Sequence, residues 1–177
     1  MDKRYYIIIG LLVVIIAMLA YGVYNSYVDS QPETFDFKDY KVTGPAGSHF
    51  HQEINSTSFY LGENDSMPVF MIGEVNISAS DFNMMLDSYN KNEISKSDLI
   101  KSFNDGMDPN VGMKPLDFNV GDFKGEPEAS ILCQNPYDGT KTILVHMILH
   151  NNDKTFMVIE FMDNPQSTSM YKSLLLK

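Results

Sequence analysis

The chain has one cysteine, no tryptophan and few basic side chains among its 177 residues. Its single cysteine, Cys133, excludes a disulfide framework and a cysteine-rich zinc site. Thirteen Lys and Arg stand against 23 Asp and Glu, which gives a formal net charge of -10. Such a surface cannot neutralise a row of phosphates, so we expect no nucleic acid among the partners.

The sequence also lacks a nucleophile elbow, a Walker phosphate loop and a dinucleotide-binding fingerprint. A hydrophobic fraction of 44%, with 12% aromatic residues, is nevertheless sufficient for a folded core. The composition therefore predicts a folded domain, and no motif indicates a cofactor.

An apolar run occupies residues 7–24, and it carries no charged side chain. A helix of that length spans about 27 Å, close to the thickness of a bilayer's hydrocarbon core. Lys3 and Arg4 precede the run, which places the N-terminus in the cytoplasm and the remainder outside. We expect a single-pass protein of the cell membrane. Its parts are a cytoplasmic tip and transmembrane anchor at 1–28, a linker at 29–34 and an extracytoplasmic domain at 35–177.

A cleavable signal peptide is the alternative interpretation, with a small-x-small cleavage site at Ala20-Tyr21-Gly22. The apolar run continues beyond the usual signal-peptide core, which favours an uncleaved anchor. A buried core helix is the third interpretation, and the charge asymmetry opposes it. Three glycosylation sequons, at Asn55, Asn64 and Asn76, fit an exported domain. The expected partners are the lipid bilayer, through residues 7–24, and an unidentified extracytoplasmic protein or ligand.

The remaining sequence predicts strands, then two helices, then an antiparallel meander and a last helix. Apolar run 156–162 is typical of a central strand covered on both faces. This order of elements is typical of an α+β fold, here a mostly antiparallel sheet packed against two or three helices behind the N-terminal transmembrane helix. The expected strands are 35–42, 69–77, 128–134, 140–149 and 155–162, with a strand or a hairpin at 49–61, and the expected helices are 80–89, 95–107 and 167–176.

Two short motifs in the last third are VGDFKG at 120–125 and NDKTFMVI at 152–159, with a strand, a glycine turn and a strand between them. This arrangement resembles the PsbP/Mog1-like α+β domain found in small membrane-anchored archaeal proteins. The tryptophan often found early in such domains is absent here. The resemblance implies a non-enzymatic binding or assembly role and carries over no catalytic residue.

All four histidines come in pairs with even spacing, His49 with His51 and His146 with His150. On strands, that spacing puts both members of a pair on one face. If the two strands were neighbours, four imidazoles would converge on a transition metal. The alternative makes His146 and His150 half-buried polar members of a sheet and leaves His49 and His51 solvated. We prefer the alternative and assign no metal ligand.

Two further features have a structural and a chemical interpretation. Glu126 and Glu128 flank Pro127 near a strand start, and we expect a solvated edge rather than an acid–base pair, because neither position looks buried. Cys133 alternates onto the face of Ala129 and Ile131, which indicates an inert buried thiol. His146 is the conceivable activating partner if that thiol is a nucleophile.

These observations favour a membrane-anchored extracytoplasmic binding or accessory domain without enzymatic activity. A metal-dependent extracytoplasmic hydrolase built on the histidine pairs is one alternative. A structural component of the cell envelope is the other.

Overall fold

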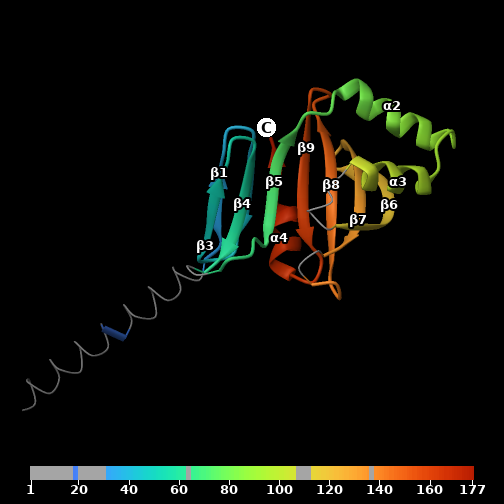
Figure 1. The fold of residues 1–177 in the computed structure, drawn as a ribbon. Helices are drawn as coiled ribbons and strands as arrows, with labels where there is room; N and C mark the ends of the chain where they lie inside the picture. Colours follow the sequence, from blue (N-terminus) through green and yellow to red (C-terminus); the bar gives the residue numbers. More distant parts are fainter. Residues whose placement is uncertain (1–17, 20–30, 63–64, 107–112, 136–137) are drawn as a thin grey trace, which may run out of the picture.

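The computed structural model describes residues 18–19, 31–62, 65–106, 113–135 and 138–177 (Figure 1). The expected membrane span at 7–24 lies outside these residues, apart from Met18 and Leu19. Within the described part of the chain, no helix combines the length and the apolar character that crossing a bilayer requires.

The described residues form two antiparallel sheets. The larger has seven strands in the order β3-β4-β5-β9-β8-β7-β6. Its strands are β3 (Ser48–Gln52), β4 (Ser56–Leu61), β5 (Phe70–Val75), β6 (Lys114–Phe123), β7 (Glu126–Gln134), β8 (Thr142–His150) and β9 (Lys154–Phe161). The smaller sheet, in the order β1-β2-β10, contains β1 (Glu33–Asp36), β2 (Tyr40–Gly44) and β10 (Leu175–Leu176).

Three helices are described outside residues 18–19, and local sequence explains where each one begins. Helix α2 (Ala79–Asn90) follows Ser78, whose side chain accepts a hydrogen bond from the Asp81 backbone N–H. Helix α3 (Lys96–Gly106) follows Ser95, which exchanges hydrogen bonds with Asp98 as in a capping box. Helix α4 (Pro165–Ser173) follows an Asn164 cap and begins with proline, which suits a position whose N–H has no helical partner.

Each face of the large sheet has its own hydrophobic core. One core packs α2 and α3 against residues such as Phe118, Ile131 and Val145. The other packs α4 and the small sheet against residues such as Phe59, Phe70 and Phe156. In Figure 1 the small sheet lies near β3, β4 and β5, while α2 and α3 lie towards the β6 end. Both faces are therefore occupied, which explains the nearly uninterrupted apolar sequence of the central strands.

The mixed α+β architecture with antiparallel pairing is confirmed, and so is the central position of the strand in run 156–162, which is β9. Both expected turns of the meander join β7 to β8 and β8 to β9. Strand β6 was not predicted, because its alternation of polar and apolar residues contains glycine and two aspartates that are typical of loops. The last helix ends at Ser173 rather than continuing, because Leu174 turns the chain into β10.

The first expected strand, 35–42, is two strands. β1 begins at Glu33, inside the expected linker at 29–34, and a tight turn at residues 37–39 leads into β2. Leu175 pairs with Lys41, so that the beginning and the end of the described domain meet in the small sheet. This closure ties the C-terminal end of α4 to β2.

Candidate functional site

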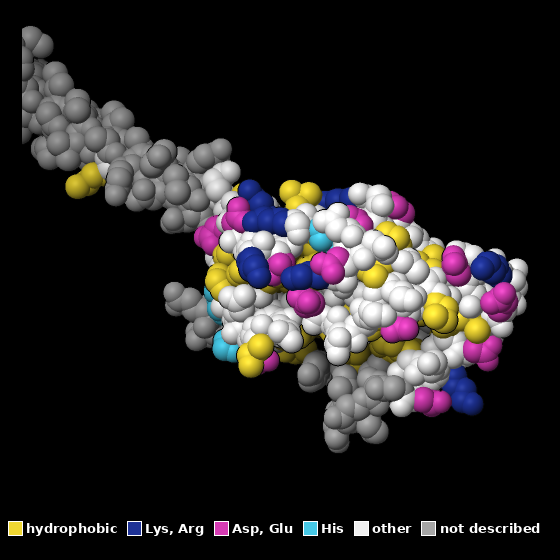
Figure 2. Space-filling model, turned by 90° about the horizontal axis from the view of Figure 1, so that it is seen from above, with side chains coloured by type: hydrophobic (Ala, Val, Ile, Leu, Met, Phe, Trp, Pro, Cys, Tyr) yellow, Lys and Arg dark blue, Asp and Glu magenta, His cyan; other side chains and the backbone are white. Residues whose placement is uncertain are grey.

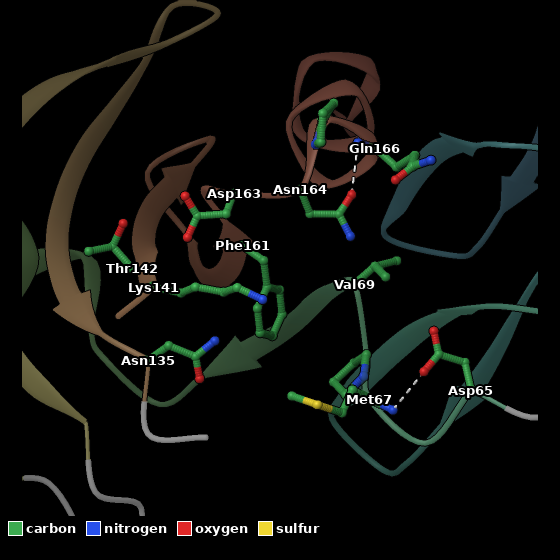
Figure 3. A pocket seen from close by; sticks show the side chains of 12 residues that line it. Asp65, Met67, Val69, Asn135, Lys141, Thr142, Phe161, Asp163, Asn164 and Gln166 are labelled. Carbon is green, nitrogen blue, oxygen red and sulfur yellow. Dashed lines mark hydrogen bonds between the residues drawn. The ribbon is translucent and has the colours of Figure 1, made fainter. Parts of the chain in front are cut away.

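A pocket opens at the end of the large sheet where β5 begins, β8 begins and β9 ends. Its volume is about 340 Å³. Asp65 and Met67 precede β5, Lys141 and Thr142 lie at the start of β8, and Asn164 and Gln166 begin α4. We call this cavity the loop-end pocket. Figure 3 shows Phe161 and Lys141 near its centre, between the α4 side and the Asp65–Met67 side.

The walls of the loop-end pocket are held by local hydrogen bonds. The Asn164 Oδ1 accepts from the Gln166 backbone N–H at 3.0 Å, as an N-cap does. The Asp65 Oδ1 accepts from the Met67 backbone N–H at 3.2 Å. The Asn135 backbone N–H donates to the Lys141 carbonyl at 2.9 Å and closes the turn between β7 and β8. The pocket is therefore shaped by caps and turns at strand ends rather than by the core.

The chemistry of this pocket is mixed. Amide, hydroxyl, carboxylate and ammonium groups stand around the ring of Phe161. The Lys141 Nζ lies 3.3 Å from Asp138. Such a lining offers hydrogen-bond donors and acceptors together with an apolar surface, which suits a polar ligand or the polar end of a partner.

A second polar cluster lies inside the core beneath α4. The His146 Nδ1 contacts the Glu128 carboxylate, and its Nε2 lies 3.2 Å from the Glu160 Oε2. The Tyr171 hydroxyl donates to the Glu128 Oε1 at 2.8 Å, and the Thr168 hydroxyl donates to Glu160. We call these five residues the His146 cluster. The His146, Glu128 and Glu160 side chains are 4%, 12% and 5% exposed, so the cluster is almost fully removed from solvent.

The register of the sheet creates this cluster. On β8, residue 146 pairs with Ser130 of β7 and with Val158 of β9. Glu128 and Glu160 each lie two residues from those partners, so both glutamates are diagonal neighbours of the imidazole on one face. Helix α4 then places Tyr171 on top, stacked on the imidazole.

Mutual hydrogen bonding outweighs burial in setting the charge states of the cluster. Burial favours a neutral imidazole, but hydrogen bonds to Glu128 and Glu160 raise the pKa of His146 above its usual 6.5. Burial likewise opposes ionisation of the glutamates, but their hydrogen bonds from His146, Tyr171 and Thr168 lower the pKa of both carboxyls below 4.5. The Tyr171 pKa is raised by burial and by its bond to Glu128. The cluster thus combines an imidazolium with two carboxylates.

The other member of this histidine pair has separate partners. The His150 Nδ1 lies 3.1 Å from the Glu126 Oε1, and its Nε2 lies 2.7 Å from the Asn151 amide nitrogen. The Asn151 backbone N–H donates to the other Glu126 oxygen at 3.2 Å. His150 is buried at the end of β8, so this group joins the β8–β9 turn to β7.

The two histidine pairs do not meet. His49 and His51 are exposed on the edge strand β3, where His49 stacks on Tyr60. Three strands separate β3 from β8, a distance of about 19 Å at about 4.8 Å per strand. Among the described residues, no group of three or more His, Cys, Asp or Glu side chains is arranged to hold a metal ion.

The remaining candidates from the sequence are the three glycosylation sequons and Cys133. Asn55 and Asn76 are exposed at the ends of strands, whereas Asn64 lies outside the described residues. Cys133 is buried on the face covered by α2 and α3, and burial raises its pKa to about 11. His146 lies on the opposite face of the sheet, so the geometry excludes a Cys133–His146 pair.

A comparison with solved structures identifies proteins with a similar fold. The chain resembles the solution structure of cyanobacterial PsbP (CyanoP) from Synechocystis sp. PCC 6803, with a TM-score of 0.52 and 11% sequence identity over 84% of this chain and 94% of that one. The chain has a PsbP-like fold. At this identity the likeness concerns the fold alone.

A crystal structure from Bacteroides thetaiotaomicron VPI-5482 matches with 13% identity over 83% of this chain and 49% of that one, at a TM-score of 0.35. No protein-family model and no curated protein sequence matches this PsbP-like chain.

The interpretation of Glu126 and Glu128 as a solvated edge was wrong. In this PsbP-like sheet β7 is an interior strand, with β6 on its other side, so Glu128 points into the core beneath α4. No sequence motif marks the His146 cluster, because its members come from four elements. One signal was present: Glu160 interrupts an otherwise apolar strand, and a buried carboxylate requires hydrogen-bonding partners.

Proposed function

We propose that the chain is a membrane-anchored extracytoplasmic binding domain with an accessory role, and that the loop-end pocket is its binding site. The anchor is apolar run 7–24, and the acidic domain stays in solution next to the bilayer. The accessory role is the one that the sequence resemblance implies, and the fold is the PsbP-like one expected from that resemblance.

One observation carries the choice of the loop-end pocket. Pro32, immediately before β1, lines a groove together with Pro165 and Gln166 of α4. The same two α4 residues line the loop-end pocket. The chain therefore enters the domain at the end where this pocket opens, and residues 25–31 reach at most about 25 Å when fully extended. An anchor at 7–24 keeps the pocket close to the membrane surface.

The opposite end of the domain has a different surface. Figure 2, seen from above the view of Figure 1, shows lysine and acidic side chains interleaved there. Lys154 accounts for part of this mixture, with carboxylate oxygens of Asp39 at 3.0 Å and of Glu74 at 3.3 Å. Paired charges of both signs offer little attraction to a partner of one sign, which also favours the pocket end.

The geometry gives less support to the hydrolase alternative. The two histidine pairs lie on strands that are not neighbours. Both ring nitrogens of His146 face carboxylates, and Tyr171 covers the ring. A general base must reach its substrate directly or through one water, and this imidazole is buried under α4.

The membrane anchor is tested in cells that make the full-length chain. We expect the protein to stay with membranes after alkaline carbonate extraction, and the domain to be degraded by protease added to intact cells. Ile15→Arg places a charge at the centre of the run and weakens insertion by about 2.5–3.5 kcal/mol, whereas Ile15→Leu is the matched control. Release of the unaltered chain by carbonate, or protection until lysis, would contradict the anchor and its orientation.

The binding site is tested by site-specific photocrosslinking. The probe p-benzoylphenylalanine replaces Met67, which lines the loop-end pocket, or Met84, which is exposed on α2. We expect an adduct of defined mass from position 67 and none from position 84. Equal adducts from both positions, or none from position 67, would contradict the pocket as the binding site. Adducts between copies of the chain from both positions would favour the envelope-component alternative.

A further inference from the structure

Helix α4 is attached to the large sheet through ionisable side chains as well as through apolar ones. Met170 and Leu174 are fully buried in the core. Thr168, in the first turn, donates to Glu160, and Tyr171, next to Met170, donates to Glu128. Both acceptors are in turn held by His146. These two polar attachments of α4 therefore depend on one imidazole.

The number of protons on that imidazole decides whether both glutamates are satisfied. An imidazolium has two N–H donors, one for each carboxylate, whereas a neutral imidazole has only one. After deprotonation, a ring lone pair faces a carboxylate oxygen inside the core, and neither atom has a proton to share. A buried hydrogen-bond acceptor without a donor lowers the stability of the closed structure. We propose that His146 is a proton-dependent clamp that holds α4, and with it the wall of the loop-end pocket, on the sheet.

The surroundings of His146 contain few other charges. Strand β7 contributes Glu128, β9 contributes Glu160, and α4 contributes Tyr171 and the more distant Lys172, which acts on Glu160. Strand β6 presents Gly121 opposite Glu128. On β8 itself, the nearest titratable neighbour on this face is His150, which is engaged with Glu126.

The pKa of His146 sets the pH above which the clamp opens. That pKa is raised above 6.5 by the two carboxylate partners, so the ring loses its second proton only at a higher pH than a free histidine does. Tyr171 stays protonated throughout, because its pKa is raised as well. Within this range His146 is thus the group of the cluster whose charge changes.

The clamp and the pocket share one helix. Pro165 and Gln166, in the first turn of α4, line the loop-end pocket, and Thr168 is two residues further along in the same turn. Other attachments of α4 do not involve His146. The Ser167 hydroxyl oxygen accepts a hydrogen bond from the Phe161 backbone N–H at 2.9 Å, Ser173 bonds the backbone of Thr43 through its hydroxyl, and the Lys124 ammonium bonds the Leu174 carbonyl at 2.6 Å. Deprotonation therefore weakens the attachments through Thr168 and Tyr171 and leaves these other bonds in place. This inference stands independently of the membrane anchor and of the identity of any ligand.

The test is amide hydrogen exchange of the full-length chain in detergent micelles, followed by mass spectrometry between pH 5.5 and 9.5 and corrected for intrinsic exchange rates. We expect exchange in α4 to increase about tenfold for each pH unit between the His146 pKa of the open and closed states. Exchange in β8 and β9 stays much slower than exchange in α4 at every pH, because these strands exchange only when the whole domain unfolds. His146→Gln removes the titration, so its α4 exchanges rapidly at every pH. His150→Gln, on the same strand but without an α4 contact, keeps the wild-type dependence.

Two results would overturn the clamp. One is corrected α4 exchange that does not depend on pH. The other is protection of α4 that equals the protection of β8 and β9 at every pH, which indicates that α4 opens only by global unfolding. If His146→Gln does not fold, NMR titration of the His146 ring in the unaltered chain gives a second test. A ring that titrates at or below pH 6.5, or without a shift in the Tyr171 resonances, would equally overturn the proposal.

Discussion

The imidazole of His146 and the phenol ring of Tyr171 stack with their centroids 4.0 Å apart and their planes 19° apart. Strand β8 and helix α4 therefore meet through two polar rings inside a core that is otherwise hydrophobic. Residues such as Phe156, Val158 and Met170 surround this contact. A polar contact in such surroundings is stable only while all its donors and acceptors are paired.

The stability of the domain should have an optimum in mildly acidic solution. Because the pKa of His146 is raised on folding, its contribution is fully present below 6.5 and is lost as pH rises through the folded-state value. The pKa values of Glu128 and Glu160 are lowered, so their contribution is present above 4.5 and is lost as pH falls. Denaturant unfolding against pH should show the largest difference between the wild type and His146→Gln between these two values. A difference that is constant from pH 4 to 9 would refute this assignment.

Removal of the imidazole should destabilise the domain strongly. His146→Leu leaves two buried carboxylates without their central partner, and we expect a loss of about 3–5 kcal/mol in the free energy of unfolding. His49→Leu is the matched control, because His49 is exposed on β3, and its effect should stay within about 0.5 kcal/mol. Equal melting temperatures for the two variants would show that the buried cluster contributes nothing to the stability of the domain.

Gly73 permits a close approach between β5 and the turn before β4. A Cβ atom at this position would lie 2.7 Å from the Asn55 carbonyl oxygen, which accepts the Glu74 backbone N–H. We expect Gly73→Ala to lower the free energy of unfolding by about 1–3 kcal/mol. Gly121→Ala is the control, since the nearest atom to its Cβ is a Glu128 oxygen at 3.8 Å. Thermal unfolding of both variants measures the effect. An unchanged melting temperature for Gly73→Ala would mean that the turn at Asn55 moves away from the new methyl group without loss of stability.

The thiol of Cys133 should be inert in the folded protein. Burial raises its pKa to about 11, and the side chain is enclosed between the sheet and the helices. At pH 8 we expect slow labelling by a disulfide reagent, which becomes complete once guanidinium unfolds the chain. In a Ser102→Cys variant, the second thiol is exposed on α3 and should react at once. Rapid labelling of the single native thiol would contradict its burial.

Local sequence patterns determined most of the secondary structure. The sequence offers Ser78 and Ser80 as caps for α2 and Ser95 as the cap for α3, and the structure uses Ser78 and Ser95. Alternation indicates β7, β8 and β9. Caps and side-chain periodicity can be recognised in the sequence because they act over a few residues. The same local signals failed for β6, where Asp117, Gly121 and Asp122 are typical of loops. Pairing with β7 along nearly its whole length makes that segment a strand.

The composition and the apolar run at 7–24 are properties of the sequence alone, and the expectation of an acidic, exported domain rests on them. The tertiary structure decided where the polar groups act. It separated His49 and His51 from His146 and His150, because the order of the strands in the sheet differs from their order along the chain. It also buried Glu128 and Glu160 on either side of His146, because diagonal neighbours in a sheet depend on register and on the helix that covers them.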